Sequence, residues 1–594
     1  MNEQSVYHLF RDVCEKNPDK IAFRYKKDDR WVEVTWREHQ ETCKTISKSL
    51  MALGIQKGDK VNILSQTRLE WIQCDFGIVG AGATTVGIYP TLLPDEVAYI
   101  INHSDGVLIF VENDEQLQKV LTERDKLKQL KHIVIIDGSG KADNGVMSWQ
   151  EFLQKGSAIS DEEFEERANN IQRDDLAAIV YTSGTTGVPK GAMLTHGNFV
   201  FTSWSAAECL YLKPEFETLL FLPLAHVFAR LIVHFCMRNA LTINIAESIE
   251  KVADNLKETR PHFFASVPRI YEKVYEKITQ GVEDAGGLKA KLFNWALGVG
   301  YQVSELKQKK QPIPGGLAFK YKLATKLVFG KIQAALGGRI VWTVSGAAPL
   351  NVDVAKFFHA CGILILEGIG MTENTSFTNV NRYDNYKFGT VGPPGPGIEQ
   401  KIAPDGEILF RGKNVMKGYY KNPEATKETI DKDGWLYTGD VGEIDEDGFL
   451  RITDRKKDLI ITAGGKNIAP QHVEKTIASS RYISQCMAYG DRKKYLVALI
   501  TLDQEQVEAW ATEQGIQYNS WDELAQHPKV RELIAREIEE QNKHLASFET
   551  IKKFFIVSRD FSIEGGELTP TLKVKRKLVT ERFRKELEAL YEED

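Results

Sequence analysis

The sequence has 594 residues, of which 76 are basic and 82 are acidic, so its formal net charge at pH 7 is −6. This length is too great for a single hydrophobic core. A prior of roughly 150 residues per domain would allow about four domains, although large α/β folds exceed that prior. The chain has no basic block suited to nucleic acid, so we expect no nucleic-acid partner.

The cysteines and the N-terminal residues indicate the cellular compartment in which the protein is expected. Seven cysteines are scattered without a Cys-x-x-Cys pair. Their odd number and spacing indicate a reducing environment and argue against a metal or disulfide framework. The first residues, Met-Asn-Glu-Gln-Ser, lack the basic and apolar regions of a signal peptide, and no apolar stretch has membrane-spanning length. We therefore expect a cytoplasmic protein, while peripheral contact with a bilayer stays open.

Helix-like and strand-like patterns alternate over the first 110 residues. Helices are expected over residues 6–14, 36–53 and 68–81, and strands over 21–25, 31–35 and 60–64. This alternation predicts an α/β fold with a largely parallel sheet and helices on both faces. Gly77, Gly80 and Gly82 are expected to ease close packing rather than to contact a ligand. The charged segment 161–170 lacks periodicity and is expected to be an exposed connection.

A glycine- and hydroxyl-rich turn follows the apolar run 176–180 and precedes a helix-like segment that opens near Asn198. A strand that ends in such a turn points its amides outward, and this arrangement holds oxyanions. Glycines permit close approach, hydroxyls donate hydrogen bonds and a lysine adds positive charge. We predict that the turn binds a triphosphate through Thr182, Ser183, Gly184, Thr185, Thr186, Gly187 and Lys190.

The spacing of this turn differs from that of a P-loop, in which glycine precedes the lysine and Ser or Thr follows it. Here Pro189 precedes Lys190, and Gly191 follows it. A plain surface turn is the structural alternative, which six consecutive Gly, Ser or Thr residues disfavour. The stretch resembles the phosphate loop of the adenylate-forming enzymes, which include acyl-CoA synthetases, luciferases and peptide-synthetase adenylation domains.

Two segments after the phosphate loop resemble the acyl-binding region of that superfamily. Residues 219–230 read as a buried strand that runs into Leu-Pro-Leu-Ala-His226, and an isolated histidine could equally be a core residue. The resemblance implies that His226 lines the acyl pocket. It also makes Arg230 a candidate substrate residue, because Arg230 stands where some long-chain members carry a tryptophan gate. Val267, in Ala-Ser-Val-Pro-Arg-Ile-Tyr271, belongs to a stretch similar to one beside the acyl channel.

Residues 272–335 form a long, basic, helical region that is broken at 311–316. A solvated helical hairpin would explain this charge pattern. The region is also similar to the insertion of the long-chain fatty acyl-CoA synthetases (AMP-forming), which favours a long acyl chain as substrate. A basic amphipathic surface of this kind is suited to anionic lipid as well.

Two turns of small residues follow the strand-like runs 339–343 and 363–366. Ligands of parallel α/β folds bind at the carboxyl edge of the sheet, so a flat adenine could lie between these turns. The family usually has tyrosine where Ile369 stands, which leaves apolar contact in place of stacking. The residues assigned to these turns are Ser345, Gly346, Ala347, Ala348, Glu367, Gly368, Ile369, Gly370, Met371 and Thr372. Of these, Ser345 and Gly346 are also candidate substrate residues.

Glu373 follows the second turn and offers a hard oxygen ligand of the kind that Mg²⁺ bound to a triphosphate requires. An exposed carboxylate at a helix start is the structural alternative. The resemblance favours the metal role, and it pairs Glu373 with the hydroxyl of Thr185.

A small β-subdomain is expected next, because residues 388–397 are rich in Pro and Gly and residues 402–411 read as a hairpin. Asp440 follows a Thr-Gly turn, where its carboxylate could accept hydrogen bonds from both ribose hydroxyls. Residues 445–448 lack the spacing of a calcium loop and are predicted to form a hairpin turn. The resemblance adds Ile452 to the nucleotide-binding residues.

A charged run at 454–458 marks the predicted boundary between a large domain, 1–454, and a small mobile α+β domain, 455–594. A charged run of this kind is also typical of a solvated turn, which is the structural alternative. By resemblance, Arg455 binds the ribose, Lys457 is the hinge, and the loop with Gly464 and Gly465 turns toward the active site during thioester formation. In the small domain we expect helices over 470–479 and 530–545 and strands over 495–502 and 553–558.

The segment Thr569-Pro-Thr-Leu-Lys573 matches the family's terminal Thr-Pro-x-x-Lys motif, with Leu572 in place of a frequent glycine. The resemblance therefore assigns the catalytic lysine to Lys573. Lys575 is the alternative, and a surface lysine before a basic helix is the structural explanation.

The ordered set of motifs implies a ligase that uses ATP, Mg²⁺ and CoA. A fatty carboxylate would form acyl-AMP, and CoA would then displace AMP. Within the same chemistry, the enzyme could activate another carboxylic acid, or the acceptor of the acyl group could be the thiol of a carrier protein. An inactive nucleotide- or acyl-lipid-binding module is an alternative from another class, which Ile369 and Leu572 would make plausible. The oligomeric state, monomer or homodimer, stays open.

Overall fold

The computed structural model describes residues 5–138, 145–182, 188–456, 460–463, 466–569 and 573–592. Among them, one sheet has the order β18-β9-β8-β4-β3-β5-β6-β7, in which β3 to β8 pair in parallel and β9 and β18 are antiparallel. Its strands are β3 (Lys60–Leu64), β4 (Thr84–Ile88), β5 (Gly106–Val111), β6 (His132–Ile135), β7 (Val146–Ser148), β8 (Leu176–Thr182), β9 (Lys190–Thr195) and β18 (Gly418–Tyr419).

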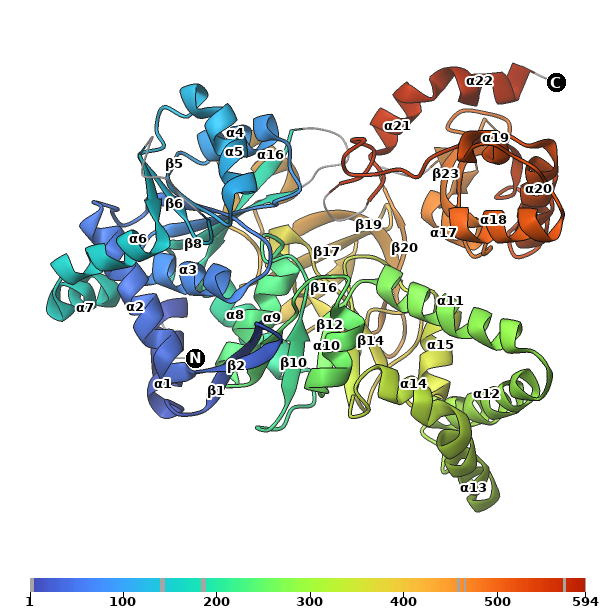
Figure 1. Ribbon diagram of the computed structural model, residues 1–594, viewed down its shortest axis with the longest axis horizontal. Coiled ribbons are helices and arrows are strands. Elements are labelled where there is room, and N and C mark those ends of the chain that lie inside the picture. The colour runs from blue at the N-terminus through green and yellow to red at the C-terminus, as the bar shows by residue number, and fades with distance from the viewer. Residues whose placement is uncertain are drawn as a thin grey trace.

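Helices cover this sheet (Figure 1). The predicted helices and strands of the first 81 residues are confirmed within a few residues at their ends. The helices are α1 (Val6–Lys16), α2 (Trp36–Ala52), α3 (Leu69–Gly80), α4 (Pro94–His103), α5 (Asp114–Thr122), α6 (Trp149–Lys155) and α7 (Asp161–Asn169). The expected exposed connection at 161–170 is wrong, because it forms α7 and buries Phe164 and Ala168.

The glycines of this region serve two purposes. A Cβ at Gly77 would lie 2.4 Å from Cγ2 of Ile46, and a Cβ at Gly80 would lie 2.6 Å from Oγ of Ser47, so these two residues permit the close contact of α3 with α2. Gly82 instead has a positive φ of 74°. A glycine is needed there for its backbone conformation.

A second sheet has the order β15-β14-β13-β12-β10-β11-β1-β2 and is parallel from β14 to β1. Its strands are β1 (Ile21–Lys27), β2 (Arg30–Thr35), β10 (Glu217–Leu220), β11 (Thr242–Ile245), β12 (Phe263–Ser266), β13 (Trp342–Ser345), β14 (Ile365–Ile369) and β15 (Asn379–Val380). Glu367 to Ile369 therefore end a strand, whereas the sequence pattern predicted a turn there. The helices that accompany this part of the chain are α8 (His196–Ala207), α9 (Val227–Arg238), α10 (Val252–Thr259) and α15 (Val352–Ala360).

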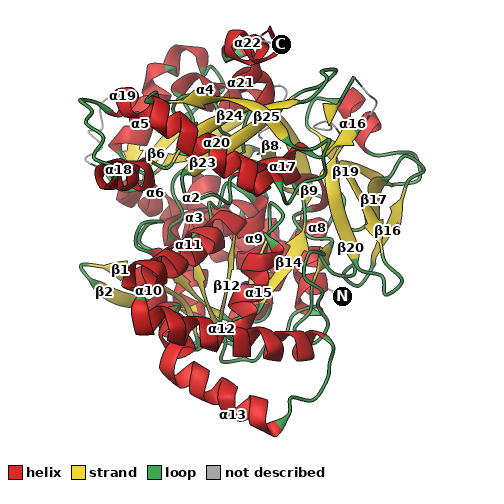
Figure 2. Cartoon of the chain, turned by 90° about the vertical axis from the view of Figure 1, so that its right-hand side faces the viewer, coloured by secondary structure: helices red, strands yellow, loops and turns green. Residues whose placement is uncertain are grey.

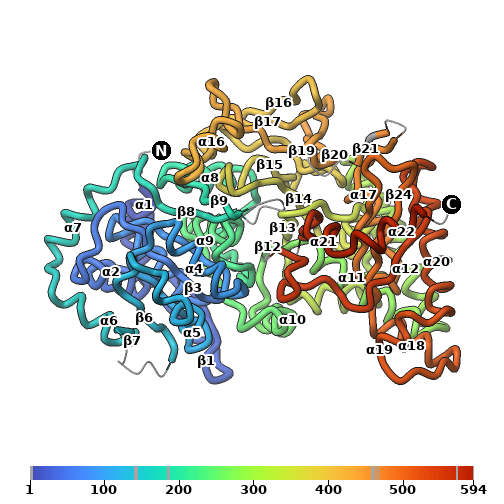
Figure 3. The backbone as a smooth tube through the Cα atoms, turned by 90° about the horizontal axis from the view of Figure 1, so that it is seen from above, coloured from blue at the N-terminus to red at the C-terminus, as the bar shows by residue number. Residues whose placement is uncertain are grey.

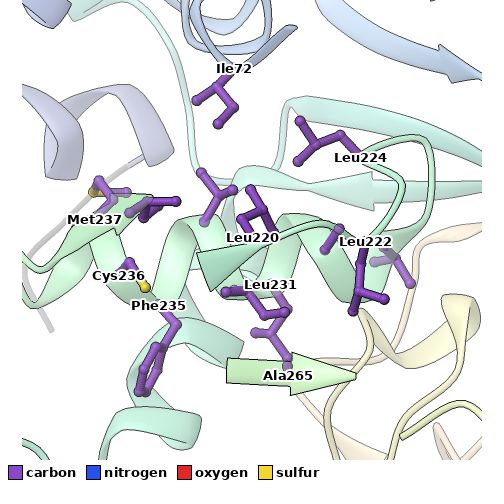
Figure 4. Packing of buried hydrophobic residues seen from close by; sticks show 14 of the residues in the cluster. Ile72, Leu220, Leu222, Leu224, Leu231, Phe235, Cys236, Met237 and Ala265 are labelled. Atoms are coloured by element: carbon purple, nitrogen blue, oxygen red, sulfur yellow. The ribbon is translucent and has the colours of Figure 1, made fainter. Parts of the chain in front are cut away.

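The core of the large domain lies between the sheets and these helices. Figure 4 shows Leu231 of α9 packed between Leu220 of β10 and Ala265 of β12. The helix is apolar around much of its surface, as expected for an element buried on several sides. It places His226, the residue before its first turn, at the carboxyl ends of the parallel strands.

The predicted β-subdomain is an antiparallel sheet in the order β16-β17-β19-β20. Its elements, with the helix beside it, are β16 (Ile398–Ile402), β17 (Glu407–Gly412), α16 (Pro423–Thr429), β19 (Leu436–Ile444) and β20 (Leu450–Arg455). Residues 445–448 turn between β19 and β20, as predicted. Asp440 lies within β19 rather than after a turn.

The C-terminal part has its own buried clusters and lies beside the large domain (Figure 3). Its three-stranded sheet has the order β23-β24-β25, in which β24 pairs antiparallel with β23 and parallel with β25. Its elements are β21 (Ile460–Ile461), β22 (Asn467–Ile468), α17 (Pro470–Ile477), β23 (Ile483–Tyr489), β24 (Leu496–Leu502), α18 (Gln504–Glu513), α19 (Trp521–Ala525), α20 (Pro528–Asn542), β25 (Ile551–Val557), α21 (Arg576–Arg582) and α22 (Arg584–Glu592). The four elements predicted here are confirmed.

The basic region is helical, as predicted, and projects from the large domain (Figure 2). It contains α11 (Pro268–Ala285), α12 (Gly287–Gln308), α13 (Gly315–Ala324), a π-helical turn (Thr325–Phe329) and α14 (Gly330–Ala335). None of the helices in the described ranges has both the length and the apolar composition that crossing a bilayer requires.

Candidate active site

An apolar pocket with about 710 Å³ of empty space lies at the carboxyl ends of the second sheet's strands. Several residues predicted from the sequence line it: His226, Gly346, Ala347, Gly368, Ile369 and Gly370. The remaining lining side chains are mostly aliphatic or aromatic, including Phe228, Phe235 and Trp342. The pocket therefore joins the two small-residue turns to a space suited to an apolar chain.

The first turn has an uncommon backbone. Ala347 adopts a φ of 68°, a left-handed conformation that residues other than glycine seldom occupy. Gly346 donates its N–H to the carbonyl of Ser266, 3.1 Å away, and a Cβ at Gly346 would lie 3.1 Å from the ring of Phe228. The turn is thus fixed against β12 and α9. Strained backbone of this kind is concentrated at functional sites.

The conformation of the second small-residue turn also depends on a glycine. A Cβ at Gly370 would lie 2.0 Å from the carbonyl oxygen of Ser376, so only glycine fits beside the turn that follows β14. Glu367 is buried, and its Oε1 accepts a hydrogen bond of 3.0 Å from the N–H of Leu350. Burial raises the pKa of Glu367 to about 7. Of the predicted residues in the two segments, Ser345, Ala348, Glu367, Met371 and Thr372 lie outside the pocket lining.

His226 begins α9, and its ring faces the pocket. Its Nδ1 accepts a hydrogen bond of 3.1 Å from the N–H of Phe228, so the neutral ring carries its proton on Nε2. Burial, and after it the positive charge of Lys573, lower the pKa of His226 to about 4. His226 is therefore neutral at pH 7, and its Nε2–H is a donor.

The pKa of His226 also depends on Lys573. Its charge acts on His226, although Lys573 belongs to the C-terminal part of the chain and His226 to the large domain. Lys573 N donates a hydrogen bond of 3.0 Å to Oγ1 of Thr569, and Thr569 N donates one of 2.8 Å to the carbonyl of Lys573. The buried Thr569 thus fixes the base of this loop. Leu572 lies outside the described residues.

Glu373, Tyr419 and Lys190 form one cluster. The Tyr419 hydroxyl donates a hydrogen bond of 2.6 Å to Oε1 of the nearly buried Glu373, and the Nζ of Lys190 lies 4.9 Å from the centre of the Tyr419 ring. Burial and the Glu373 carboxylate raise the pKa of Tyr419 well above its usual range, so the hydroxyl keeps its proton. Strand β18 pairs Tyr419 with Ala192 of β9 and thereby brings these residues together.

Sequence reasoning missed Tyr419. The available signal was weak, because Gly418-Tyr-Tyr420 before an Asn-Pro turn is an ordinary strand end. Most of the predicted phosphate loop, from Ser183 to Gly187, lies outside the described residues. Its two ends face each other, since Thr182 pairs with Lys190 across β8 and β9, and the Thr182 hydroxyl donates to the Lys190 carbonyl over 3.4 Å.

Asp440 and Arg455 meet across β19 and β20. The Nε of Arg455 lies 3.2 Å from Oδ1 of Asp440, and the two residues are register partners. Ile452 lies on the same strand as Arg455 and packs against the core of the large domain. The predicted hinge Lys457 and the glycines at 464 and 465 lie outside the described residues.

Arg230 has a different environment from the one expected of a gate. Its side chain is 2% exposed, pairs with Asp75 over 2.7 Å, and stacks near the rings of Phe199 and Trp71. Among the described residues, the pocket lining includes neither Arg230 nor Val267. Arg230 therefore acts in the core as an ion pair between α9 and α3, and Val267 precedes α11.

The two parts of the chain also meet at α11 and α17. The Nζ of Lys475 in α17 donates to the carbonyl of Pro349, next to the first small-residue turn. Gln280 and Gln506 exchange hydrogen bonds of 3.0 and 3.2 Å, and Arg481 lies 3.9 Å from Glu283. Burial lowers the pKa of Lys475, while Glu272 and Glu367 oppose that shift.

Two family models match this chain. Residues 10–420 match the AMP-binding enzyme family, and residues 457–594 match the AMP-binding enzyme C-terminal domain. Long-chain-fatty-acid–CoA ligase FadD15 of Mycobacterium tuberculosis is 36% identical over 97% of this chain and 95% of its own length. Long-chain-fatty-acid–CoA ligase ACSBG2 of Homo sapiens is 31% identical over 99% of this chain and 92% of its own length.

Solved structures share the fold. The anthranilate CoA ligase AuaEII in complex with anthranoyl-AMP has a TM-score of 0.72 and 22% identity, and the match covers 97% of each chain. The adenylation domain of a carboxylate reductase from Mycobacterium chelonae has a TM-score of 0.76 and 21% identity, covering all of this chain and 92% of that one. At these identities the likeness concerns the fold.

Proposed function

This chain belongs to the family of AMP-binding enzymes, and from that premise we propose how it acts as a long-chain fatty acid–CoA ligase. The overall reaction converts a fatty acid, ATP and CoA into acyl-CoA, AMP and pyrophosphate. A fatty carboxylate oxygen attacks the α-phosphorus of ATP, and the bond to pyrophosphate breaks. The CoA thiolate then attacks the acyl carbonyl carbon, and AMP leaves.

The single observation that supports the proposal is that the positive charge of Lys573 contributes to the lowered pKa of His226, a residue that lines the pocket. In the first step an anion approaches a polyanion, so catalysis requires positive charge where negative charge accumulates. We assign this task to Lys573 from the small domain and to Lys190 with the phosphate-loop amides from the large one. His226 is neutral at pH 7, and its Nε2–H is suited to orient the carboxylate without adding charge.

The Glu373 cluster fits Mg²⁺ that is held mainly by nucleotide phosphates. The described residues contain no group of three or more His, Cys, Asp or Glu that could hold a metal by itself. A single carboxylate suits this cation, because Mg²⁺ commonly uses one or two carboxylates together with phosphate oxygens and water. Glu373, oriented by Tyr419, and Thr185 would hold it, and the bound ion supplies charge neutralisation at the phosphates.

We assign the adenine to the segments 345–348 and 367–372, with Ile369 giving apolar contact in place of stacking. Asp440 would accept hydrogen bonds from the ribose hydroxyls, and Arg455, 3.2 Å from it, would fix its position. The apolar remainder of the pocket is suited to the acyl chain. Its lining of Phe228, Phe235, Trp342 and aliphatic residues supports a long hydrocarbon rather than a small polar acid.

The second step requires space for the thiol of CoA. We propose that the small domain, 455–594, turns about Lys457, withdraws Lys573 and brings the loop of Gly464 and Gly465 to the site. The described contacts between α11 and the small domain include polar ones, such as that of Gln280 with Gln506, and a polar interface is consistent with a movable one. We also propose that the enzyme takes its substrate at a lipid surface while located in the cytoplasm.

The test is release of pyrophosphate that depends on both ATP and a fatty acid, followed by thioester formation with CoA. We expect release to increase with acyl chain length up to the capacity of the pocket. A panel of aliphatic and aromatic acids, assayed with free CoA and with a carrier protein, identifies acid and acceptor. An absence of pyrophosphate release with every acid would favour an inactive binding module, for which Ile369 is the residue to examine first.

A further inference from the structure

The projecting helices α12 and α13 carry an unusual charge. Between residues 286 and 331 the sequence contains nine lysines, one glutamate and neither arginine nor aspartate, a formal charge of +8 in a chain whose net charge is −6. The structure exposes Lys320, Lys322 and Lys326 on and after α13. Long-range attraction to a negatively charged partner follows from this concentration of positive charge.

Large apolar side chains are exposed among these lysines. Phe319 is 71% exposed and Leu288 is 82% exposed, and Leu323 and Leu327 are each about 40% exposed. Phe319, Leu323 and Leu327 follow one another at intervals of four residues, so they form a stripe along α13 and the π-helical turn. We call this stripe, with Lys320, Lys322 and Lys326, the α13 face.

Packing within the protein does not account for the stripe. Leu317 and Tyr321 of α13 pack against the core, and Ala324 is buried, so the helix already has an inward apolar side. The α13 face is a second apolar side of the same helix. It lies at an outer edge of the molecule, remote from the first sheet (Figures 1 and 2). Clustered exposed apolar side chains of this kind mark interaction sites.

We propose that the α13 face docks onto an anionic lipid bilayer, with Phe319, Leu323 and Leu327 entering the interfacial region and the lysines contacting headgroup phosphates. The proposal deepens the lipid-surface contact proposed above and rests on it. A helix that lies in the interface combines these two features, an apolar stripe and flanking lysines. Lysine side chains are long enough to reach the headgroups while their stems cover apolar surface.

Charge and chemistry disfavour other occupants. A second copy docking through the same face would bring the three lysines of each α13 face together, within regions that each carry a formal charge of +8 over residues 286–331. Nucleic acid would attract the lysines but gives no reason to expose Phe319 and Leu288. An acidic protein would satisfy the charge, and the experiment below separates it from a bilayer because the only partners offered are vesicles.

The test is co-sedimentation of the full chain with phosphatidylcholine vesicles and with vesicles that contain phosphatidylglycerol. We expect binding to the anionic vesicles and little to the neutral ones. The variant Lys320→Glu/Lys322→Glu/Lys326→Glu should lower the partition coefficient by about tenfold or more, because each lysine near an anionic surface contributes to binding. The variant Phe319→Ser/Leu323→Ser should lower it similarly and should keep its defect in high salt, which screens only the charged contribution.

Matched controls make the same changes elsewhere. Lys128→Glu/Lys131→Glu/Lys155→Glu changes the net charge equally at exposed lysines, of which Lys155 ends α6 on the opposite side of the molecule in Figure 1. Leu93→Ser/Ile249→Ser removes apolar side chains that are 55% and 51% exposed. We expect both controls to bind within twofold of the parent chain.

Equal losses in test and control variants would overturn the proposal, as would an absence of binding to anionic vesicles. ATP–pyrophosphate exchange with a fatty acid dispersed in detergent is measured on every variant. Exchange should be unchanged, since the α13 face lies outside the pocket. Vesicle binding by a chain without exchange activity would contradict the proposed catalysis and leave the docking proposal standing.

Discussion

At the scale of single residues, Lys573 has the task that is easiest to isolate. In the proposed mechanism, replacing Lys573 with alanine removes a positive charge from the transition state of adenylate formation, and we expect that step to slow by about a hundredfold or more. Attack of CoA on preformed acyl-AMP should change little, because in the domain movement proposed above the lysine is withdrawn for that step. Rapid-quench assays of each half-reaction measure the two effects. Equal losses in both would contradict the alternation of domains.

Lys575 is the natural control for that experiment. It precedes α21, and its N–H donates to the carbonyl of Glu567 over 2.7 Å. Lys575→Ala removes the same charge two residues away. We expect it to leave adenylate formation within a fewfold of the parent enzyme. A larger defect in Lys575→Ala than in Lys573→Ala would reverse the assignment of the catalytic lysine.

Tyr419 gives a second prediction at this scale, because it fixes the carboxylate assigned to Mg²⁺. Tyr419→Phe removes a hydrogen bond of 2.6 Å to Glu373, and a hydrogen bond to a charged group contributes about 1.5–3 kcal/mol. We expect adenylate formation to slow by about tenfold and the Mg²⁺ concentration for half-maximal rate to rise. Titration of Mg²⁺ in the exchange assay measures both quantities.

The adjacent tyrosine supplies the comparison. Tyr420 donates its hydroxyl to Asp105 over 2.7 Å, a contact between the residue after β18 and the residue before β5 that does not involve Glu373. Tyr420→Phe should therefore leave the Mg²⁺ dependence unchanged. If the two variants showed the same Mg²⁺ dependence, the role given to Tyr419 would be wrong.

At the scale of elements, the contact of α2 with α3 depends on Gly77. Alanine at this position would place Cβ 2.4 Å from Cγ2 of Ile46, so the helices must separate, and overpacking of this kind costs about 1–3 kcal/mol. Gly281→Ala is the comparison, since Gly281 lies within α11 and, apart from the neighbouring backbone of that helix, no heavy atom of the described residues lies within 4 Å of the added Cβ. Alanine there should stabilise the helix by up to about 1 kcal/mol. Urea midpoints that shift in the same direction would contradict this reasoning.

Elements with strong local patterns could be predicted from the sequence. Strand β3 (Lys60–Leu64) has the predicted bounds because an apolar β-type run is closed by loop residues on both sides. Helix α7 was missed because only Phe164 and Ala168 of its nine residues are buried, which leaves little periodicity to detect. The predicted start of the second nucleotide turn was wrong because β14 extends to Ile369, where it pairs with β15.

Residues of the candidate site could be predicted only where they belong to a short sequence motif. His226 and the glycines of the two turns were identified by their own neighbours in sequence, and they line the pocket. The contact of Tyr419 with Glu373 spans 46 residues and the pairing of Arg230 with Asp75 spans 155, so both depend on the tertiary fold. Local patterns contain no information on such contacts, which is why Arg230 was given a substrate role that its buried ion pair does not support.

At the scale of the whole molecule, Lys475 connects the small domain to the nucleotide turns. Its ammonium group is attracted by Glu272 and Glu367 and donates to the carbonyl of Pro349. Lys475→Met should therefore weaken the arrangement that forms the adenylate and slow that half-reaction by about three- to tenfold. Thioester formation from acyl-AMP should be unaffected. Lys493→Met is the control, because Lys493 pairs with Glu588 inside the small domain.

The same contact predicts a dependence on pH. Burial raises the pKa of Glu367 to about 7, above its value in the unfolded chain, and the charge of Lys475 opposes that rise. The stability that Glu367 contributes is therefore present at low pH and lost as pH rises from about 4.5 through 7, by up to about 3 kcal/mol. Glu367→Gln should lack this loss when urea unfolding is compared between pH 5 and 8, and Lys475→Met should move the loss to higher pH.

Attraction between the domains has the opposite dependence on pH, because only ionised Glu367 attracts Lys475. Adenylate formation should thus decline as pH falls through 7 in the parent enzyme, and a decline of equal size in Glu367→Gln would exclude Glu367 as its source.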